Sequence, residues 1–105
     1  MDAHCLAVYP AEEWERLSQK VAAIPESKGA QLKRWLFSGA CEMVPDQQGR
    51  ILIPQDLRQF AGLEKDVVVI GANNKAEIWN RASWETANAA VDLDEMMSIL
   101  DTLGF

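Results

Sequence analysis

The chain has 105 residues, of which 49% are hydrophobic and 25% are charged, and its formal net charge at pH 7 is −6. This is the composition of an ordinary soluble globular protein, and no apolar run approaches the length that spans a bilayer. The negative charge argues against a protein whose whole surface binds nucleic acid.

The first part of the chain predicts one strand and two helices. Cys5–Tyr9 is apolar and strand-like, and Glu12–Ala23 carries apolar side chains at helical spacing until Pro25 ends the helix. A second helix is expected from about Ser27 to Phe37, and Gly39 stops it.

The middle of the chain predicts a hairpin followed by a short helix. Cys41–Val44 and Arg50–Ile53 are expected to be strands joined by a polar turn at Pro45–Gly49. A proline then opens a helix over Gln55–Ala61, with Gly62 as its expected C-terminal cap.

The last third predicts a second hairpin and two helices. Asp66–Ala72 is strand-like because it is rich in β-branched residues, and two asparagines turn the chain into a strand over Lys75–Trp79. A helix follows over Ala82–Ala90, and Asp92 with Glu95 forms a capping pair for a final helix. That helix has an apolar stripe that needs a partner surface. The stripe consists of Met96, Met97, Ile99, Leu100 and Leu103.

Two stretches of the chain match at a constant spacing of 70 residues. Both predict a short strand that ends in an aromatic residue and is followed by a helix, which indicates a duplicated structural unit. The strand-rich block that precedes the second copy, Gly39–Asn74, has no counterpart before the first copy. The first unit is therefore expected to lack its front half. The matched residues are Tyr9 with Trp79, Trp14 with Trp84, and Glu15 with Glu85.

Side chains for enzymatic or metal chemistry are scarce. The single histidine, His4, leaves no conventional Ser/His or Cys/His pair, and no CxxC or HxxxH spacing predicts a metal site. Cys5 and Cys41 lie in apolar, strand-like surroundings and are interpreted as free thiols of the cytoplasm, with a disulfide as the alternative. His4 is expected to be exposed and without a role. We expect that the chain is not an enzyme and that it binds no cofactor, no metal ion and no small-molecule substrate.

Charge is unevenly distributed along the chain. The segment from Lys28 to Arg58 contains five bases and three acids, whereas the segment from Glu85 to the end contains five acids and no base. Charged residues usually cover solvated helix faces, but the middle segment is where an anionic partner is best tolerated.

The polar turn in that middle segment contains residue types that read DNA. Gly49 can supply a positive φ, and Asp46 can accept hydrogen bonds from backbone amides two residues on. Gln47, Gln48 and Arg50 are free to project outward, and arginine pairs with guanine as glutamine pairs with adenine. From the residues alone, a solvated hairpin turn without a ligand is the simpler interpretation, and DNA reading is the alternative.

The ordered motifs resemble those of the MraZ family, a branch of the AbrB-like swapped-hairpin regulators. The family's signature block is similar to Asp46–Pro54 followed by Leu57-Arg58 and Ala61-Gly62-Leu63. The rest of its second repeat is similar to Val67–Gly71, Glu77-Ile78-Trp79 and Trp84, and the end of its first repeat is similar to Cys5–Pro10 with Trp14. The resemblance covers roughly residues 5–90 and favours the DNA-reading hypothesis.

The resemblance implies an α+β fold, in which an AbrB-like swapped-hairpin β-barrel unit has flanking helices. The expected divisions are 1–38 for the remainder of the first repeat, 39–91 for the second repeat and 92–105 for a C-terminal helix. A full-length member has a second D-x-x-x-R element upstream, which this chain lacks. The remaining hairpin is therefore expected to dimerise or to expose apolar edges.

The resemblance also implies a function. Members of the family are cytoplasmic, nucleoid-associated repressors of the division and cell-wall gene cluster, and their subunits form rings that read repeated promoter boxes in double-stranded DNA. The family's reading arginine is matched by Arg50, with Asp46 as its partner and Gln47 and Gln48 as flanking contacts. The alternative is an oligomerisation or protein-interaction module that no longer binds DNA because its first repeat is incomplete. Further candidates, for phosphate contacts, are Lys33, Arg34 and Arg58.

Overall fold

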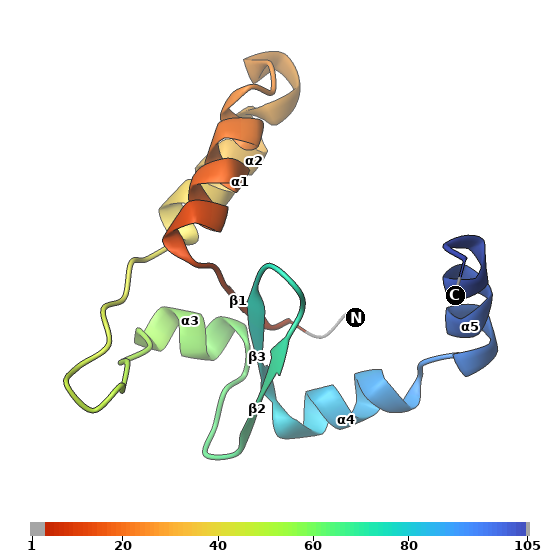
Figure 1. Ribbon diagram of the computed structural model, residues 1–105. Coiled ribbons are helices and arrows are strands. Elements are labelled where there is room, and N and C mark those ends of the chain that lie inside the picture. The colour runs from red at the N-terminus through yellow and green to blue at the C-terminus, as the bar shows by residue number, and fades with distance from the viewer. Residues whose placement is uncertain (1–3, 105) are drawn as a thin grey trace.

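The computed structural model describes residues 4–104, and it combines five helices with a three-stranded sheet in that range (Figure 1). The fold is therefore mixed α+β. The elements are β1 (Leu6–Val8), α1 (Ala11–Ala22), α2 (Glu26–Gly39), α3 (Gln55–Phe60), β2 (Val67–Gly71), β3 (Ala76–Asn80), α4 (Arg81–Ala89) and α5 (Leu93–Thr102).

The sheet brings the two copies of the sequence repeat into contact. Its strand order is β1-β3-β2 with antiparallel pairing throughout, so that Leu6 lies opposite Ile78 in the centre. The strands β1 and β3 are the matched segments of the repeat. Each copy also has the same aromatic contact, with ring centroids 6.1 Å apart for Tyr9 and Trp14 and 5.7 Å apart for Trp79 and Trp84. The 70-residue spacing thus corresponds to a repeated three-dimensional feature.

A small core forms where α3 packs on the sheet. Leu6, Ala61 and Ile78 are its buried side chains, and four partly buried apolar residues surround them. The end of α3 is held by Gly62, which has φ +62° and lets Leu63 N–H donate to the Arg58 carbonyl at 2.9 Å. The partly buried residues are Val8, Ile53, Leu57 and Leu63.

The helices α1 and α2 form a closed hairpin that stands apart from the sheet (Figure 1). Its closure depends on Val21, which is buried, and on an edge-to-face contact between Trp14 and Phe37 with ring centroids 6.1 Å apart. At the turn, a methyl group on Gly29 would lie only 2.6 Å from Cγ2 of Ile24. Only glycine fits there without a shift of its neighbour.

The chain as a whole is extended. Its Cα radius of gyration is 16.4 Å, whereas a compact chain of this length has about 13 Å. Every residue from Val91 to Gly104 is exposed, and α5 points away from both the sheet and the α1–α2 hairpin (Figure 1). In residues 4–104 no helix is long and apolar enough to cross a membrane.

The prediction of strands at Cys41–Val44 and Arg50–Ile53 was wrong. These segments flank the turn without helix or strand structure, and one backbone bond, from Asp46 N–H to the Arg50 carbonyl at 2.8 Å, closes the turn between them. A strand requires a ladder of paired backbone groups, whereas these two described segments share a single backbone hydrogen bond and neither joins the sheet.

The two cysteines differ in their surroundings. Cys41 is exposed, so the prediction of an apolar environment was wrong for this residue, because its segment does not join the sheet. Cys5 is half-buried, and this burial, with the Glu77 carboxylate, raises the pKa of its thiol although Lys75 opposes the shift. His4 is exposed as expected, and its ring stacks on Phe60 with centroids 4.6 Å apart.

Candidate nucleic-acid interface

Residues 40–54 form an arm that projects from the body of the molecule, with the polar turn at its tip (Figure 1). Gly49 has φ +78°, as predicted, and its N–H donates to the Asp46 carbonyl at 3.0 Å. A side chain at position 49 would strain this backbone. The turn is therefore defined by its own local chemistry and not by packing.

The Asp46 carboxylate organises the turn. Its Oδ1 accepts hydrogen bonds from the backbone N–H groups of Gln48 at 2.8 Å and Arg50 at 2.9 Å, which confirms the predicted contact two residues on. These two backbone donors, together with the Arg50 side chain, hold the pKa of Asp46 below its ordinary value. At neutral pH the carboxylate is charged and can accept all of these hydrogen bonds.

The same carboxylate orients Arg50. Oδ2 of Asp46 lies 3.2 Å from Nε of Arg50, and the arginine side chain is 73% exposed. Because this contact uses Nε, the two terminal nitrogens of the guanidinium remain for a bidentate contact with an external acceptor. Gln47 and Gln48 are exposed beside it on the same turn. The arrangement presents one fixed cation and two amides on a protruding tip.

The three candidate phosphate contacts do not gather around this tip. Lys33 is engaged within the α1–α2 hairpin, where its Nζ lies 2.8 Å from Oε1 of Glu26 and its side chain is only 17% exposed. Arg34 is exposed on α2, and Arg58 is exposed on α3 near the base of the arm. The structure thus groups Asp46, Gln47, Gln48 and Arg50, and it separates the other bases from them.

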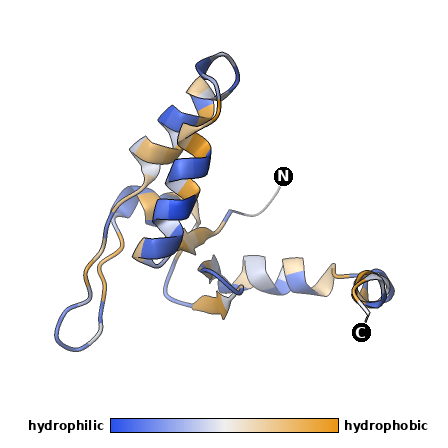
Figure 2. Ribbon diagram, turned by 45° about the horizontal axis from the view of Figure 1, so that its top comes forward, coloured by the Kyte–Doolittle hydropathy of each residue, from blue (hydrophilic) through white to orange (hydrophobic). Residues whose placement is uncertain are grey.

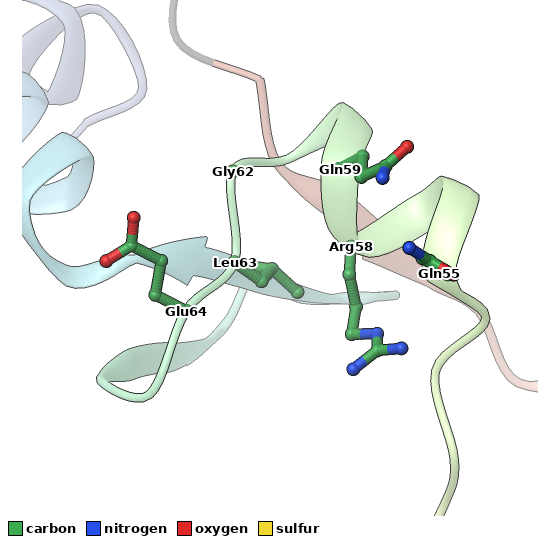
Figure 3. A pocket seen from close by; sticks show the side chains of 6 residues that line it. All are labelled: Gln55, Arg58, Gln59, Gly62, Leu63 and Glu64. Atoms are coloured by element: carbon green, nitrogen blue, oxygen red, sulfur yellow. The ribbon is translucent and has the colours of Figure 1, made fainter.

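A shallow depression of about 300 Å³ surrounds Arg58 (Figure 3). It was missed in the sequence, although the spacing of Gln55, Arg58 and Gln59 on one helical face was a signal for it. Figure 3 shows Arg58 and Gln59 pointing in different directions, so their polar groups do not converge on a ligand. The lining is completed by Gly62, Leu63 and Glu64.

The two flanks of the arm are apolar and open. Figure 2 shows hydrophobic stretches on both sides of a hydrophilic tip. Val44 is 81% exposed and Leu52 is 84% exposed, which are high values for large apolar side chains. The arm therefore has a polar end with an exposed guanidinium and apolar flanks that are largely uncovered.

Residues 36–98 match a family model described as "MraZ protein, putative antitoxin-like". This match spans more than half of the chain and includes the whole arm. The chain belongs to the MraZ family. The family resemblance seen in the motifs is thereby confirmed.

Relatives with the name "Transcriptional regulator MraZ" match over most of the chain. The protein of Heliobacterium modesticaldum is 51% identical over 86 residues, which are 80% of this chain and 60% of that protein. The protein of Lachnoclostridium phytofermentans is 44% identical over 101 residues, with 95% and 71% covered, respectively. The protein of Clostridium tetani is 42% identical over 104 residues, with 96% and 73% covered. The chain thus spans 60 to 73% of the length of these three relatives.

Proposed function

We propose that this chain is a sequence-specific DNA-binding transcriptional regulator, repressor-like in action, whose Asp46–Arg50 turn enters the major groove. The observation that carries the proposal is the double use of the Asp46 carboxylate, which closes the turn and holds Nε of Arg50. A solvated turn without a ligand needs the first contact but not the second. The names of the relatives support the same class of function.

The way in which Arg50 would recognise a base follows from the planar geometry of its guanidinium group. The terminal nitrogens of Arg50 would donate to O6 and N7 of one guanine, a contact that discriminates against the wrong base by about 1–3 kcal/mol. Gln47 and Gln48 would contact neighbouring base edges or phosphates. Four of the five acids from Glu85 to the end lie on α5 or at its N-cap, and the arm does not approach this helix (Figure 1). The net charge of −6 therefore does not oppose this contact directly.

One turn offers too few contacts for tight binding, so we propose that several copies act together. Linked copies raise the effective concentration of each turn, and short boxes repeated along a promoter would engage them in series. The partners proposed are thus double-stranded DNA and further copies of the chain. The target proposed is the promoter of the division and cell-wall gene cluster, with a cytoplasmic, nucleoid-associated location.

The proposed fold of the reading unit is an AbrB-like swapped hairpin over residues 39–91, flanked by the first-repeat segment 1–38 and the C-terminal segment 92–105. The apolar flanks of the arm support this, because Val44 and Leu52 would be covered if a second hairpin paired with the arm. Backbone groups left without a ladder in the arm would be paired by the same step.

A second candidate is an oligomerisation or protein-interaction module that does not bind DNA. The observation that favours it is the amount of uncovered apolar surface on the arm, α2 and α5, against a core of only three clustered buried side chains. Such a surface favours a protein partner, whether or not the Asp46–Arg50 turn binds DNA.

Binding to a duplex from upstream of the gene, compared with a scrambled duplex, separates the two candidates. We expect Arg50→Ala to abolish the preference and Arg50→Lys to keep weak, salt-sensitive binding without the preference, since lysine retains the charge but not the fork. The control is Arg16→Ala, because Arg16 is an exposed arginine on α1 whose guanidinium lies 3.4 Å from the carboxylate of Glu13. No binding of the wild type to either duplex would favour the interaction module, and equal binding to both duplexes would contradict sequence-specific reading.

A further inference from the structure

The helix α5 has the features of a docking element with no partner inside its own chain. The six apolar residues of α5 and its C-cap lie on one side of the helix, and the polar residues, Asp94, Glu95, Ser98, Asp101 and Thr102, lie on the other side. All of its side chains are exposed. A helix of 10 residues is marginal in water without tertiary packing. The apolar residues are Leu93, Met96, Met97, Ile99, Leu100 and Leu103.

Charge excludes a second α5 as the covering partner. The helix with its cap has four acids and no base, so two copies of α5 placed side by side would bring like charges together. The partner surface must instead be apolar with basic residues around it.

The outer face of α2 meets both requirements. Lys28, Leu32 and Trp35 follow one another at spacings of four and three, which places them on one stripe of the helix. Trp35 is 61% exposed, more than any other described tryptophan, tyrosine or phenylalanine side chain. Arg34 is exposed beside this stripe. Within α2, Glu26 is the one acid, and it is occupied by Lys33 at 2.8 Å.

The two surfaces also match in length and charge spacing. Lys28 and Arg34 are six residues apart on α2, and Glu95 and Asp101 are six residues apart on α5. Six residues correspond to about 9 Å along a helix in both cases. Both acids lie beside the apolar stripe of α5. This is the position of charged residues at the rim of an interface.

We propose that α5 of one copy docks through its apolar side on the outer face of α2 of a second copy, with its acids beside Lys28 and Arg34. Within one chain the two helices lie at opposite ends of the molecule, joined through α4 and the sheet (Figures 1 and 2). The contact is therefore head to tail, and each copy uses α5 toward one neighbour and α2 toward another. This rests on the proposed self-association but not on the reading of DNA.

A complementation experiment tests the proposal without DNA, by sedimentation velocity over a concentration series. One variant, Met97→Asp/Leu100→Asp, disables α5, and the other, Leu32→Asp/Trp35→Asp, disables α2. Each variant alone is expected to lose the mass increase with concentration that the wild type shows. A mixture of both is expected to form a one-to-one complex and stop there, because one intact α5 meets one intact α2. Ser98→Asp, on the polar side of α5, is the matched control and is expected to associate as the wild type does.

Charge reversal provides the second measurement. Lys28→Glu/Arg34→Glu is expected to weaken association at least about tenfold, and adding Glu95→Lys/Asp101→Lys in the same chain is expected to restore it. Three results would overturn the proposal: a wild type that stays monomeric, variants that still associate alone, or a mixture that remains monomeric. Preferential DNA binding by the two variants is scored separately, so a failure of this contact is distinguishable from a failure of the proposed function.

Discussion

The α1–α2 pair and the α4–α5 pair follow equivalent strands of the repeat, and each pair is joined by three residues, 23–25 and 90–92. The first pair is closed and the second is open. In the closed pair the residue at the fourth position of the second helix is Gly29, which lies against Ile24. In the open pair that position is Met96, and the residue equivalent to Ile24 is Val91. A methionine cannot occupy the space that Gly29 leaves.

This difference shows that two copies of the same strand-and-helix unit pack differently. Because Gly29 has no side chain, Ile24 can lie close to the backbone of α2. The α1–α2 pair therefore covers part of its apolar surface, and Val21 is buried. The second pair lacks this approach, so its apolar residues remain for another surface. A difference of a few side chains therefore separates a helix pair that covers its apolar residues from one that leaves them exposed.

The largest effect is expected from two valines that lie 70 residues apart in the sequence, one in the closed pair and one in the open pair. Val21→Ala should lower the free energy of unfolding by about 2 kcal/mol, because two methyl groups are lost from a buried site. Val91→Ala should change it by less than about 0.5 kcal/mol, because Val91 is exposed. Urea unfolding of both variants at low protein concentration measures this, and equal losses would break the distinction between a closed and an open pair.

Gly29 is the next test of closure. Gly29→Ala should destabilise the α1–α2 hairpin by about 1–2 kcal/mol, although alanine favours helix, because its methyl group would lie 2.6 Å from Ile24. Gly39→Ala is the matched control, since a Cβ there meets no atom within 4 Å. Thermal unfolding of the two variants compares them. A Gly29→Ala chain as stable as Gly39→Ala would show that the close approach does not determine closure.

A smaller effect is expected at the start of α5. The Asp92 side chain accepts a hydrogen bond from Glu95 N–H at 3.2 Å, and Asp92→Ala should lower the stability of this helix by about 1 kcal/mol. Asp92→Asn should retain most of it, because asparagine also caps. The Cα chemical shifts of residues 93–102 report the helix content. No change in these shifts would mean that a contact other than the cap holds α5 in helical form.

The smallest effect concerns pH and is confined to the closed pair. The hydrogen bond and charge of Lys33 hold the pKa of Glu26 below its ordinary value of about 4.3. Because the folded pKa is the lower one, the stabilisation is complete above the unfolded value and is lost as the pH falls through the folded value. Glu26→Gln should therefore remove part of the pH dependence of unfolding below about pH 4.5. A wild type and variant with parallel stability curves between pH 3 and 6 would contradict this.

Local sequence patterns predicted most helices and the turn at the tip of the arm. Asp46 and Gly49 determine that turn through bonds within five residues, so their roles were readable without knowledge of the fold. Gly62 at the end of α3 and the side-chain cap of Asp92 were predicted for the same reason. In contrast, the strands on both sides of the turn were predicted from apolar composition alone. Their assignment failed because strand structure depends on a neighbouring segment.

The candidate site shows the same division between near and distant contacts. The tip residues were grouped correctly because they are adjacent in the sequence. Lys33 is a candidate phosphate contact from its charge alone, whereas in the structure it pairs with Glu26 on the same helix and only 17% of its side chain is exposed. The depression around Arg58 also depends on how the chain returns after Gly62.

By itself the sequence determined what is local: helix bounds to within a few residues, the shape of the Asp46–Arg50 turn, the repeat and the family. The tertiary structure decided which apolar residues are covered. Leu6 and Ile78 are buried because two segments 70 residues apart in the repeat pair in the sheet, whereas Leu52 and Met97 are equally apolar and stay exposed. The hydrophobic effect favours burial of any apolar side chain but is not directional. The segment against which each side chain packs is determined by the geometry of the whole chain.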